Sequence, residues 1–123
     1  MKCLDFDDLL VKTYDILTTY SDIKRKWQNR YKFVLVDEFQ DTNDIQFDLI
    51  KLIVGEDNSL FVVGDPDQTI YTWRGANIKL IMNFERDFKG VEDITLEKNY
   101  RSTQKILDAA NSLIRVNKER LDK

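Results

Sequence analysis

The sequence predicts an α/β fold with a mostly parallel sheet and flanking helices. Short apolar runs at residues 33–36 and 60–63 each suit a buried parallel strand. Between them, residues 43–54 carry a helical apolar pattern. Strand, helix, strand is the order of a βαβ unit, whose crossover is right-handed. The chain has 123 residues and a single proline, and it shows no evident linker, so one domain is the default expectation.

The remaining elements follow from caps and apolar spacing. We expect helices over residues 5–19, with Asp5 as the cap, and over about 21–31, with Ser21 as the cap. Asn43 and Gln46 form a capping-box pattern at the start of the central helix. Later elements are expected as a helix over 77–88 ended by Gly90, a short third strand over 94–96, and a final helix capped by Ser102 or Thr103.

Composition excludes several kinds of chemistry. The chain has no histidine, so it cannot by itself build a Ser-His-Asp triad or a His-ligated zinc site. Its single cysteine, Cys3, rules out an internal disulfide and favours a reducing, cytoplasmic compartment. No apolar run is long enough for a membrane span, and we expect no membrane partner. Because the net charge is −3, any contact with DNA must use a local patch or other parts of a larger protein.

Two acids follow the first strand directly. In open parallel sheets, ligands bind outside the carboxyl ends of the strands, so residues at these ends are candidates for a site. Asp37 and Glu38 have the Walker B arrangement, in which one carboxylate holds Mg²⁺ and the next is aimed at the water that attacks the γ-phosphate. The alternative is a pair of solvated acids at a strand end.

A polar and aromatic segment, residues 64–76, follows the second strand. Gly64 permits a close backbone approach or a strained turn. Gln68 has both a donor and an acceptor and can sense a phosphate and a water. Tyr71, Trp73 and Arg74 can form a stacking platform for unpaired bases. The alternative is that Tyr71 and Trp73 are core residues under the next helix.

The third expected strand leads to residues 99–102. Arg101 can clamp a phosphate with two hydrogen bonds and stabilise transition-state charge. The alternative is a surface arginine near a helix start.

Taken together, these segments resemble UvrD/Rep/PcrA-type superfamily 1 DNA helicases. Residues 36–43 resemble motif II of that family, residues 63–76 motif III, and residues 96–103 motif IV. Residues 4–10 are similar to the segment after the family's inserted helical subdomain. The resemblance covers almost the whole chain in the family's order and spacing, and its motif III part is long and specific.

The resemblance implies a RecA-like (P-loop NTPase) fold, ATP and Mg²⁺ as cofactors, and a role for each matched residue. Asp37 would hold Mg²⁺, and Glu38 would be the catalytic base and contact Mg²⁺ through water. Gln68 would contact the γ-phosphate and the attacking water, and would link the nucleotide to the DNA site. Tyr71 and Trp73 would stack on single-stranded bases, with Arg74 in the same loop. Tyr100 would stack on adenine, and Arg101 would be an arginine finger.

The resemblance also divides the chain between two motor domains. Residues 1–98 would be the C-terminal part of the first RecA-like domain, and residues 99–123 the start of the second. The partners it implies are single-stranded DNA, the duplex junction and the remaining domains of a parent helicase. Such enzymes translocate three-prime to five-prime and unwind duplex DNA during repair or replication.

The phosphate-loop motif of the family is missing from the sequence, as are the family's later motifs. No glycine of the four is followed by lysine, so the phosphate loop Gly-x-x-x-x-Gly-Lys-[Ser/Thr] is absent. In RecA-like sheets the strand of that loop lies between the strand before Asp65 and the one ending near Leu96. We therefore expect exposed strand edges, marginal stability or self-association, and no ATP hydrolysis by the isolated chain.

Two other interpretations remain open. The chain can be a piece of the motor of a helicase-nuclease, or a stand-alone, non-catalytic remnant that binds single-stranded DNA or a partner helicase.

Overall fold

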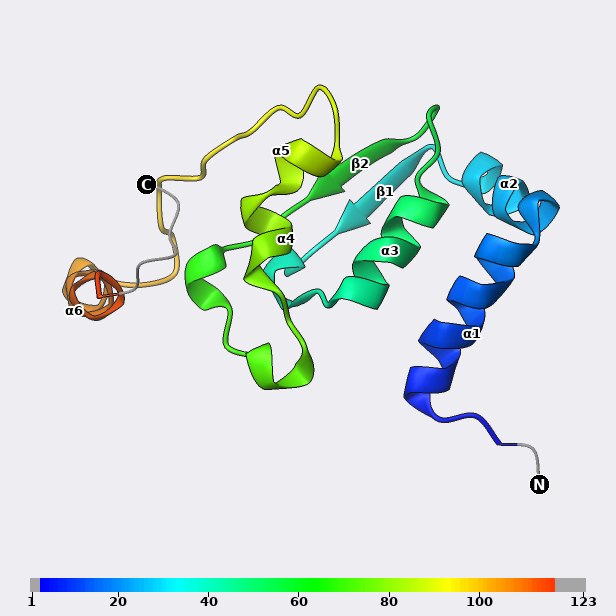
Figure 1. Cartoon of the computed structure of the whole chain (residues 1–123). Coiled ribbons are helices and arrows are strands. Elements are labelled where there is room, and N and C mark those ends of the chain that lie inside the picture. Colours follow the sequence, from blue (N-terminus) through cyan, green and yellow to red (C-terminus); the bar gives the residue numbers. More distant parts are fainter. Residues whose placement is uncertain (1–2, 117–123) are drawn as a thin grey trace. The chain divides into compact units, whose positions relative to one another are not determined.

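The computed structural model describes residues 3–116. They fall into two compact units, one ending at Ile81 and the other beginning at Met82. The first contains helices α1, α2 and α3 and a parallel sheet of β1 and β2, and the second contains helices α5 and α6 (Figure 1). Helix α4 runs from Ile78 to Met82, across the division. The α/β class predicted from the sequence is thus confirmed.

Local capping fixes where the helices of the first unit begin. Helix α1, Phe6–Thr19, starts at Asp5, whose side chain accepts a hydrogen bond from the Asp8 N–H at 2.8 Å in a complete capping box. Helix α3, Asp44–Ile53, starts with the predicted capping box of Asn43 and Gln46. Helix α2 is Ser21–Arg30, and its N-cap is Tyr20, so Ser21 is the first helical residue and not the cap.

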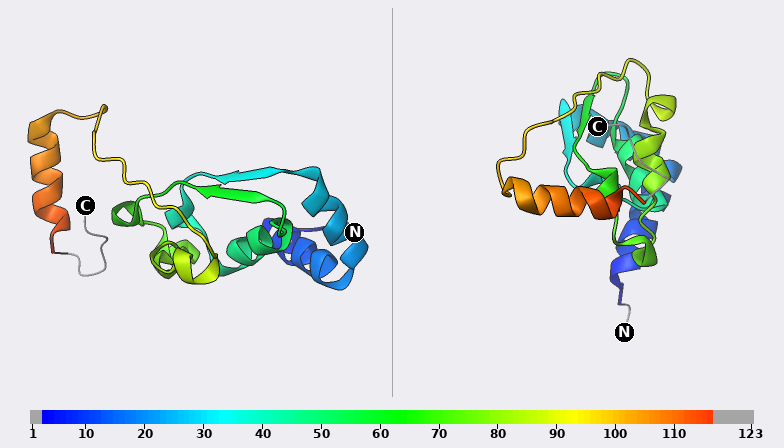
Figure 2. Two further views of the ribbon diagram at one scale, coloured as in Figure 1. Left: turned by 90° about the horizontal axis from the view of Figure 1, so that it is seen from above. Right: turned by 90° about the vertical axis from the view of Figure 1, so that its left-hand side faces the viewer.

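The sheet has two parallel strands, β1 (Phe33–Val36) and β2 (Ser59–Val62). Val36 lies opposite Val62, so both strands end at the same edge. Helices α1, α2 and α3 all lie on one side of this sheet, as Figure 2 shows, with α1 and α2 packed on α3. The βαβ order therefore brings residues that follow β1 close to those that follow β2.

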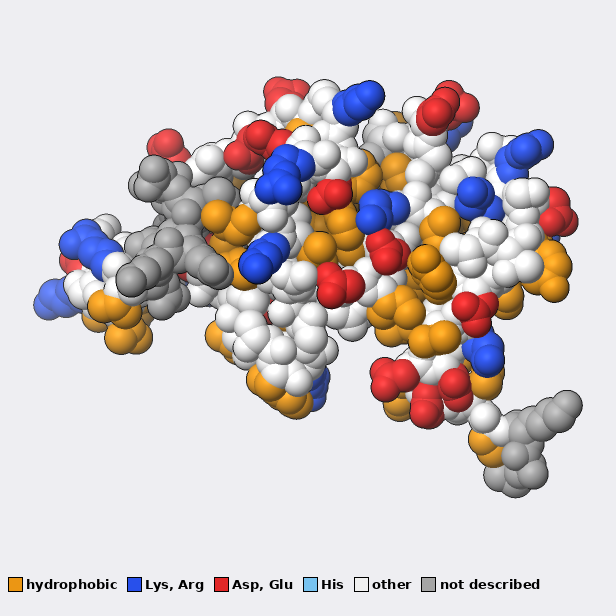
Figure 3. All heavy atoms as spheres, viewed as in Figure 1, with side chains coloured by type: hydrophobic (Ala, Val, Ile, Leu, Met, Phe, Trp, Pro, Cys, Tyr) orange, Lys and Arg blue, Asp and Glu red, His pale blue; other side chains and the backbone are white. Residues whose placement is uncertain are grey.

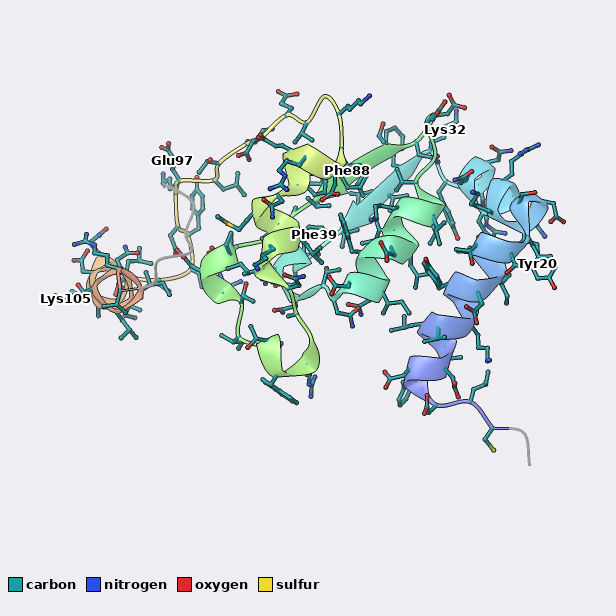
Figure 4. All side chains as sticks on the ribbon, viewed as in Figure 1. Tyr20, Lys32, Phe39, Phe88, Glu97 and Lys105 are labelled. Carbon is teal, nitrogen blue, oxygen red and sulfur yellow. The ribbon has the colours of Figure 1, made fainter. Side chains whose placement is uncertain are left out.

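The core of this unit lies between the helices and the helix-facing side of the sheet. Its buried residues include Leu17, Phe39, Phe47 and Leu49. The rings of Phe39 and Phe47 meet edge to face with centroids 6.0 Å apart. Phe39 lies just beyond the end of β1 (Figure 4). Core packing thus reaches the residue that directly follows the two acids.

The strands are half-buried on one face and exposed on the other, which corrects the expectation of fully buried strands. Phe33, Leu35 and Phe61 are 69%, 72% and 55% exposed on the face without helices. Hydrophobic side chains are also exposed along α1, beyond the acidic side chains of its first turn (Figure 3). Exposed apolar sheet faces are typical of surfaces that another layer covers.

The chain after residue 77 has less regular structure than the sequence predicted. The expected helix over 77–88 is broken at Asn83 into α4 and α5 (Phe84–Asp87). Helix α6 spans Gln104–Ile114, and its N-cap, Thr103, makes no side-chain capping bond.

The predicted third strand over residues 94–96 is wrong. Residues 91–99 have no regular structure, and Ile94 and Leu96 are 67% and 84% exposed. A strand exists only when a neighbour accepts and donates its backbone hydrogen bonds. Within residues 3–116, β1 and β2 pair only with each other, so no strand pairs with this segment.

No helix in the described part of the chain is both long enough and apolar enough to span a membrane.

Candidate functional site

The two acids predicted from the first strand lie at the edge of the sheet and are exposed. The Glu38 N–H donates to Asp37 Oδ1 at 2.9 Å. Glu38 has a left-handed backbone, with φ 51° and ψ 41°, and no other non-glycine residue of the described chain has a positive φ. This conformation costs about 1–2 kcal/mol for a residue with a Cβ. Backbone strain of this kind clusters at functional sites.

Core packing and hydrogen bonds hold the turn after Glu38. Phe39 is 1% exposed, and its N–H donates to the Val63 carbonyl at 2.9 Å. The Asp41 N–H donates to the Glu38 carbonyl at 2.9 Å, closing the short 3-10 helix η1 (Phe39–Asp41). The residue after the strained Glu38 is therefore fixed both by its buried ring and by a hydrogen bond to the residue that follows β2.

Gln40 connects this turn to the end of β2. Its side chain is buried, and its Nε2 donates to Glu38 Oε2 at 2.6 Å. Its Oε1 accepts from the Asp65 N–H at 3.1 Å. One side chain thus spans the two strand ends.

The segment after β2 is held by Asp65. Its carboxylate caps the 3-10 helix η2 (Pro66–Gln68) by accepting from the Asp67 N–H at 3.0 Å. The other carboxylate oxygen accepts from Gln68 Nε2 at 2.9 Å. Gln68 is exposed, so Asp65 holds its amide at the sheet edge that also carries Glu38. Glu38, Gln40, Asp65 and Gln68 form one connected hydrogen-bond network.

Gly64 allows the two strand ends to approach each other. A Cβ on Gly64 would lie 2.8 Å from Gln40 Oε1 and 2.9 Å from Ile81 Cδ1. Both distances are shorter than real Cβ atoms show. The Cβ would also lie 3.2 Å from the backbone nitrogen of Gln40, so of the two predicted uses of this glycine, a close backbone approach or a strained turn, the structure shows the close approach.

The aromatic cluster lies further along the same segment. Tyr71 precedes the 3-10 helix η3 (Thr72–Arg74), and its ring centroid is 6.3 Å from that of Trp73. The Arg74 guanidinium carbon lies 4.5 Å from the Trp73 centroid and 5.4 Å from the Tyr71 centroid. Tyr71 and Trp73 are 38% and 72% exposed. The structure therefore contradicts the alternative that Tyr71 and Trp73 are core residues under the next helix.

Tyr100 and Arg101 belong to the second unit. Tyr100 is 85% exposed, and the Lys98 ammonium lies 5.1 Å from its ring centroid. The Asn99 side chain accepts from the N–H groups of Arg101 and Ser102, each at 2.9 Å. Asn99 thus fixes the turn that presents both side chains to solvent before α6.

The acids at the sheet edge fit a Mg²⁺ that keeps most of its waters, and not a metal site built from three or more protein ligands. No group of three or more His, Cys, Asp or Glu residues in the described part of the chain is placed to hold a metal ion. Mg²⁺ needs only one or two carboxylates, because it keeps several waters and binds phosphate oxygens. Asp37, exposed at the edge, can supply such a ligand.

Sequence reasoning missed Gln40 and Asp65 as parts of this site. Both lie in the motif segments, but their types give no chemical signal, because a glutamine or aspartate near a strand end is usually solvated. Only the pairing of β1 with β2 shows that the Gln40 side chain connects Glu38, after β1, with Asp65, after β2.

The comparisons with known proteins place the chain in a family. The model of the UvrD/REP helicase N-terminal domain matches residues 1–89. The chain belongs to the UvrD-type helicase family.

Relatives support this assignment over nearly the whole chain. A probable DNA helicase II homolog of Mycoplasma capricolum is 53% identical over 117 residues, 95% of this chain. The ATP-dependent DNA helicase PcrA of Leuconostoc citreum is 48% identical over 98% of the chain, and PcrA of Staphylococcus aureus is 46% identical over 99%. The chain spans only 16–17% of the length of these relatives.

Proposed function

We propose that this chain is part of the motor of an ATP-dependent DNA helicase, in which it joins an ATP site to a surface for single-stranded DNA. One observation carries the proposal. Glu38 after β1 and Gln68 after β2 belong to one hydrogen-bond network, and Asp37 accepts from the Glu38 N–H. Exposed aromatic residues follow Gln68 after only two residues. The family of the chain and the names of its relatives support the same function.

The residues of the network have separate roles in this proposal. Asp37 holds Mg²⁺, which neutralises charge on the phosphates when it is bound. Glu38, which would also face a bound Mg²⁺ through water, accepts the proton of the attacking water. Gln68 contacts the γ-phosphate and that water, and its position is set by Asp65.

The exposed aromatic and basic residues bind single-stranded DNA and further parts of ATP in this proposal. Tyr71 and Trp73 stack on successive unpaired bases, and Arg74, above both rings, adds positive charge. Tyr100 stacks on the adenine of ATP, and Arg101 neutralises γ-phosphate charge in the transition state. Translocation three-prime to five-prime and unwinding during repair or replication would then belong to the parent enzyme.

The isolated chain is proposed not to hydrolyse ATP, because its sequence holds no phosphate loop to bind the β- and γ-phosphates. Turnover must therefore be tested in a complete motor. A suitable one is PcrA of Leuconostoc citreum with its matched segment replaced by this chain, since 48% identity favours a compatible fold.

The decisive variant in this chimera is Glu38→Gln, with Glu56→Gln as a control at an exposed acid in the turn before β2. We expect the unsubstituted chimera to show ATPase activity stimulated by single-stranded DNA. Loss of the base should lower kcat by about 10²–10⁴-fold, with ATP binding retained. An inactive chimera, or equal effects at both positions, would contradict the proposal.

The DNA contact is tested by Trp73→Ala, with Trp27→Ala as the control. Trp27 is also partly exposed, but it stacks on Tyr31 in the region of α2. Loss of a base-stacking contact should cost about 1–3 kcal/mol in single-stranded DNA affinity, measured by fluorescence anisotropy. Binding of single-stranded DNA by the isolated chain, with the same affinity with and without ATP, would favour the non-catalytic alternative.

A further inference from the structure

The Gln40 side chain has a defined orientation between two partners. It is 2% exposed, so solvent cannot replace its contacts. The Glu38 carboxylate can only accept a hydrogen bond, and the Asp65 N–H can only donate one. The amide nitrogen must therefore face Glu38, at 2.6 Å, and the amide oxygen must face Asp65, at 3.1 Å. No other arrangement satisfies both partners.

The network continues beyond Asp65 to Gln68. The same aspartate that donates its N–H to Gln40 accepts from the Gln68 side-chain amide at 2.9 Å. A displacement of Gln40 therefore changes both ends of the network, the Glu38 carboxylate and the Gln68 amide. Gly64 leaves just enough room for this connection, because any Cβ there would meet Gln40 Oε1.

Glu38 needs such a support. Its side chain is exposed and its backbone is left-handed, so rotation of the side chain is restrained mainly by the bond from Gln40. A side chain immobilised by a buried neighbour is held close to one geometry, which a reacting group requires.

We propose that Gln40 is the positioning residue for Glu38 and connects it mechanically to Gln68. The inference rests on the proposed function, in which Glu38 is the catalytic base. Gln40 does not touch ATP or water in this role. It acts by holding the Glu38 carboxylate and by tying the carboxylate to the loop that continues to the aromatic cluster.

The test uses Gln40→Met in the PcrA chimera, since methionine keeps the length of the side chain and removes both hydrogen bonds. Gln28→Met is the matched control. Gln28 is half-buried and also joins two elements, because its Nε2 donates to the Leu52 carbonyl at 3.0 Å. Gln40→Glu is the second variant. It keeps an acceptor for the Asp65 N–H but replaces the donor to Glu38 with a negative charge.

We expect both Gln40 variants to lower kcat by about 10- to 100-fold, because misplacing a reacting group by about 1 Å costs up to about a hundredfold. The KM for ATP should stay within about twofold, since only the hydrolytic step loses its geometry. Gln28→Met should leave both constants unchanged. An equal loss of kcat in Gln28→Met would show a general structural effect and overturn the proposal.

A double-mutant cycle separates positioning from structure. In a Glu38→Gln chimera, residual turnover should not fall further when Gln40→Met is added, since residues that act as a unit are non-additive. Multiplicative losses would overturn the positioning role while leaving the proposed function intact. An unsubstituted chimera without ATPase activity would overturn the proposed function itself, and the role of Gln40 with it.

Discussion

The end of the sheet and the segment over residues 91–101 contain similar sequence patterns, but they fold differently. After β1 and β2, buried residues and hydrogen bonds fix Glu38, Gln40 and Gln68. Before α6, residues 91–99 have no regular structure, and Tyr100 is 85% exposed. Each region contains a short strand-like run, at residues 33–36 and 60–63 in the sheet and at residues 94–96 before α6. In each case polar residues that are candidates for phosphate chemistry follow the run.

The difference shows what converts a strand pattern into a site. Residues after β1 and β2 meet because the strands pair in register and end together. The 94–96 segment has the apolar residues of a strand, but no neighbouring strand pairs with it within residues 3–116. A pattern in sequence thus gives a preference for a strand, whereas pairing supplies the geometry.

The largest effect on stability is expected from Phe39→Ala. This ring is 1% exposed and packs against Phe47, so its removal leaves a cavity beside the turn that holds Glu38. Phenylalanine-to-alanine changes in a core cost about 3–5 kcal/mol. In a unit this small, urea unfolding followed by circular dichroism should show loss of most of the folded population at low denaturant.

A matched control for that change is Phe61→Ala, because Phe61 is 55% exposed on the face without helices. We expect a much smaller loss of stability there. Equal effects at both positions would mean that the outer face of the sheet is as well packed as the core, for example through self-association, and would contradict the one-sided burial.

The second expected effect is at Gly64. In Gly64→Ala the new methyl group would meet Gln40 Oε1 and Ile81 Cδ1, and such overpacking costs about 1–3 kcal/mol. Adding Ile81→Val removes the Cδ1 atom, so the double variant should be less destabilised than the sum of the two single changes. Strict additivity in urea unfolding would show that the methyl group is accommodated in another way.

Sequence reasoning succeeded where short-range chemistry decides the outcome. Asp5 and Asn43 cap α1 and α3 as predicted, because their capping boxes depend on residues only three positions away. It failed at residues 94–96, where the outcome depends on a distant strand. It also missed Gln40, whose role depends on a contact with Asp65, 25 positions away.

The site residues also divide into those that the sequence predicts and those that depend on distant contacts. The order of motifs along the chain was enough to choose Asp37, Glu38 and Gln68 as candidates. The sequence did not show how Glu38 and Gln68 are connected, because the connecting Gln40 and Asp65 are polar residues of common types. The roles of these residues, of the aromatic cluster and of Arg101, and the predicted boundary at residues 98–99, stay predictions until they are tested in a complete motor.

A smaller effect is expected at the helix caps, where the two units can be compared directly. Asn43 accepts from the Gln46 N–H at 3.0 Å, whereas Thr103 makes no side-chain bond at the start of α6. Asn43→Ala should cost about 1 kcal/mol, which is about a fivefold loss of amide protection in α3 by hydrogen exchange. Thr103→Ala should change protection in α6 by much less, and a larger change there would contradict the cap geometry.

The smallest effect is expected at Leu96, in the segment that does not form a strand. Because Leu96 is 84% exposed, Leu96→Ala removes little packing and should change the free energy of unfolding of the isolated chain by less than about 0.5 kcal/mol. In the PcrA chimera, where the remaining sequence of the motor is present, the same change should destabilise measurably if a neighbouring strand then pairs with residues 94–96. A loss of stability in the chimera alone would show that residues 94–96 form a strand only when a neighbouring strand is present. No loss in either protein would mean that Leu96 is a surface residue in the motor as well.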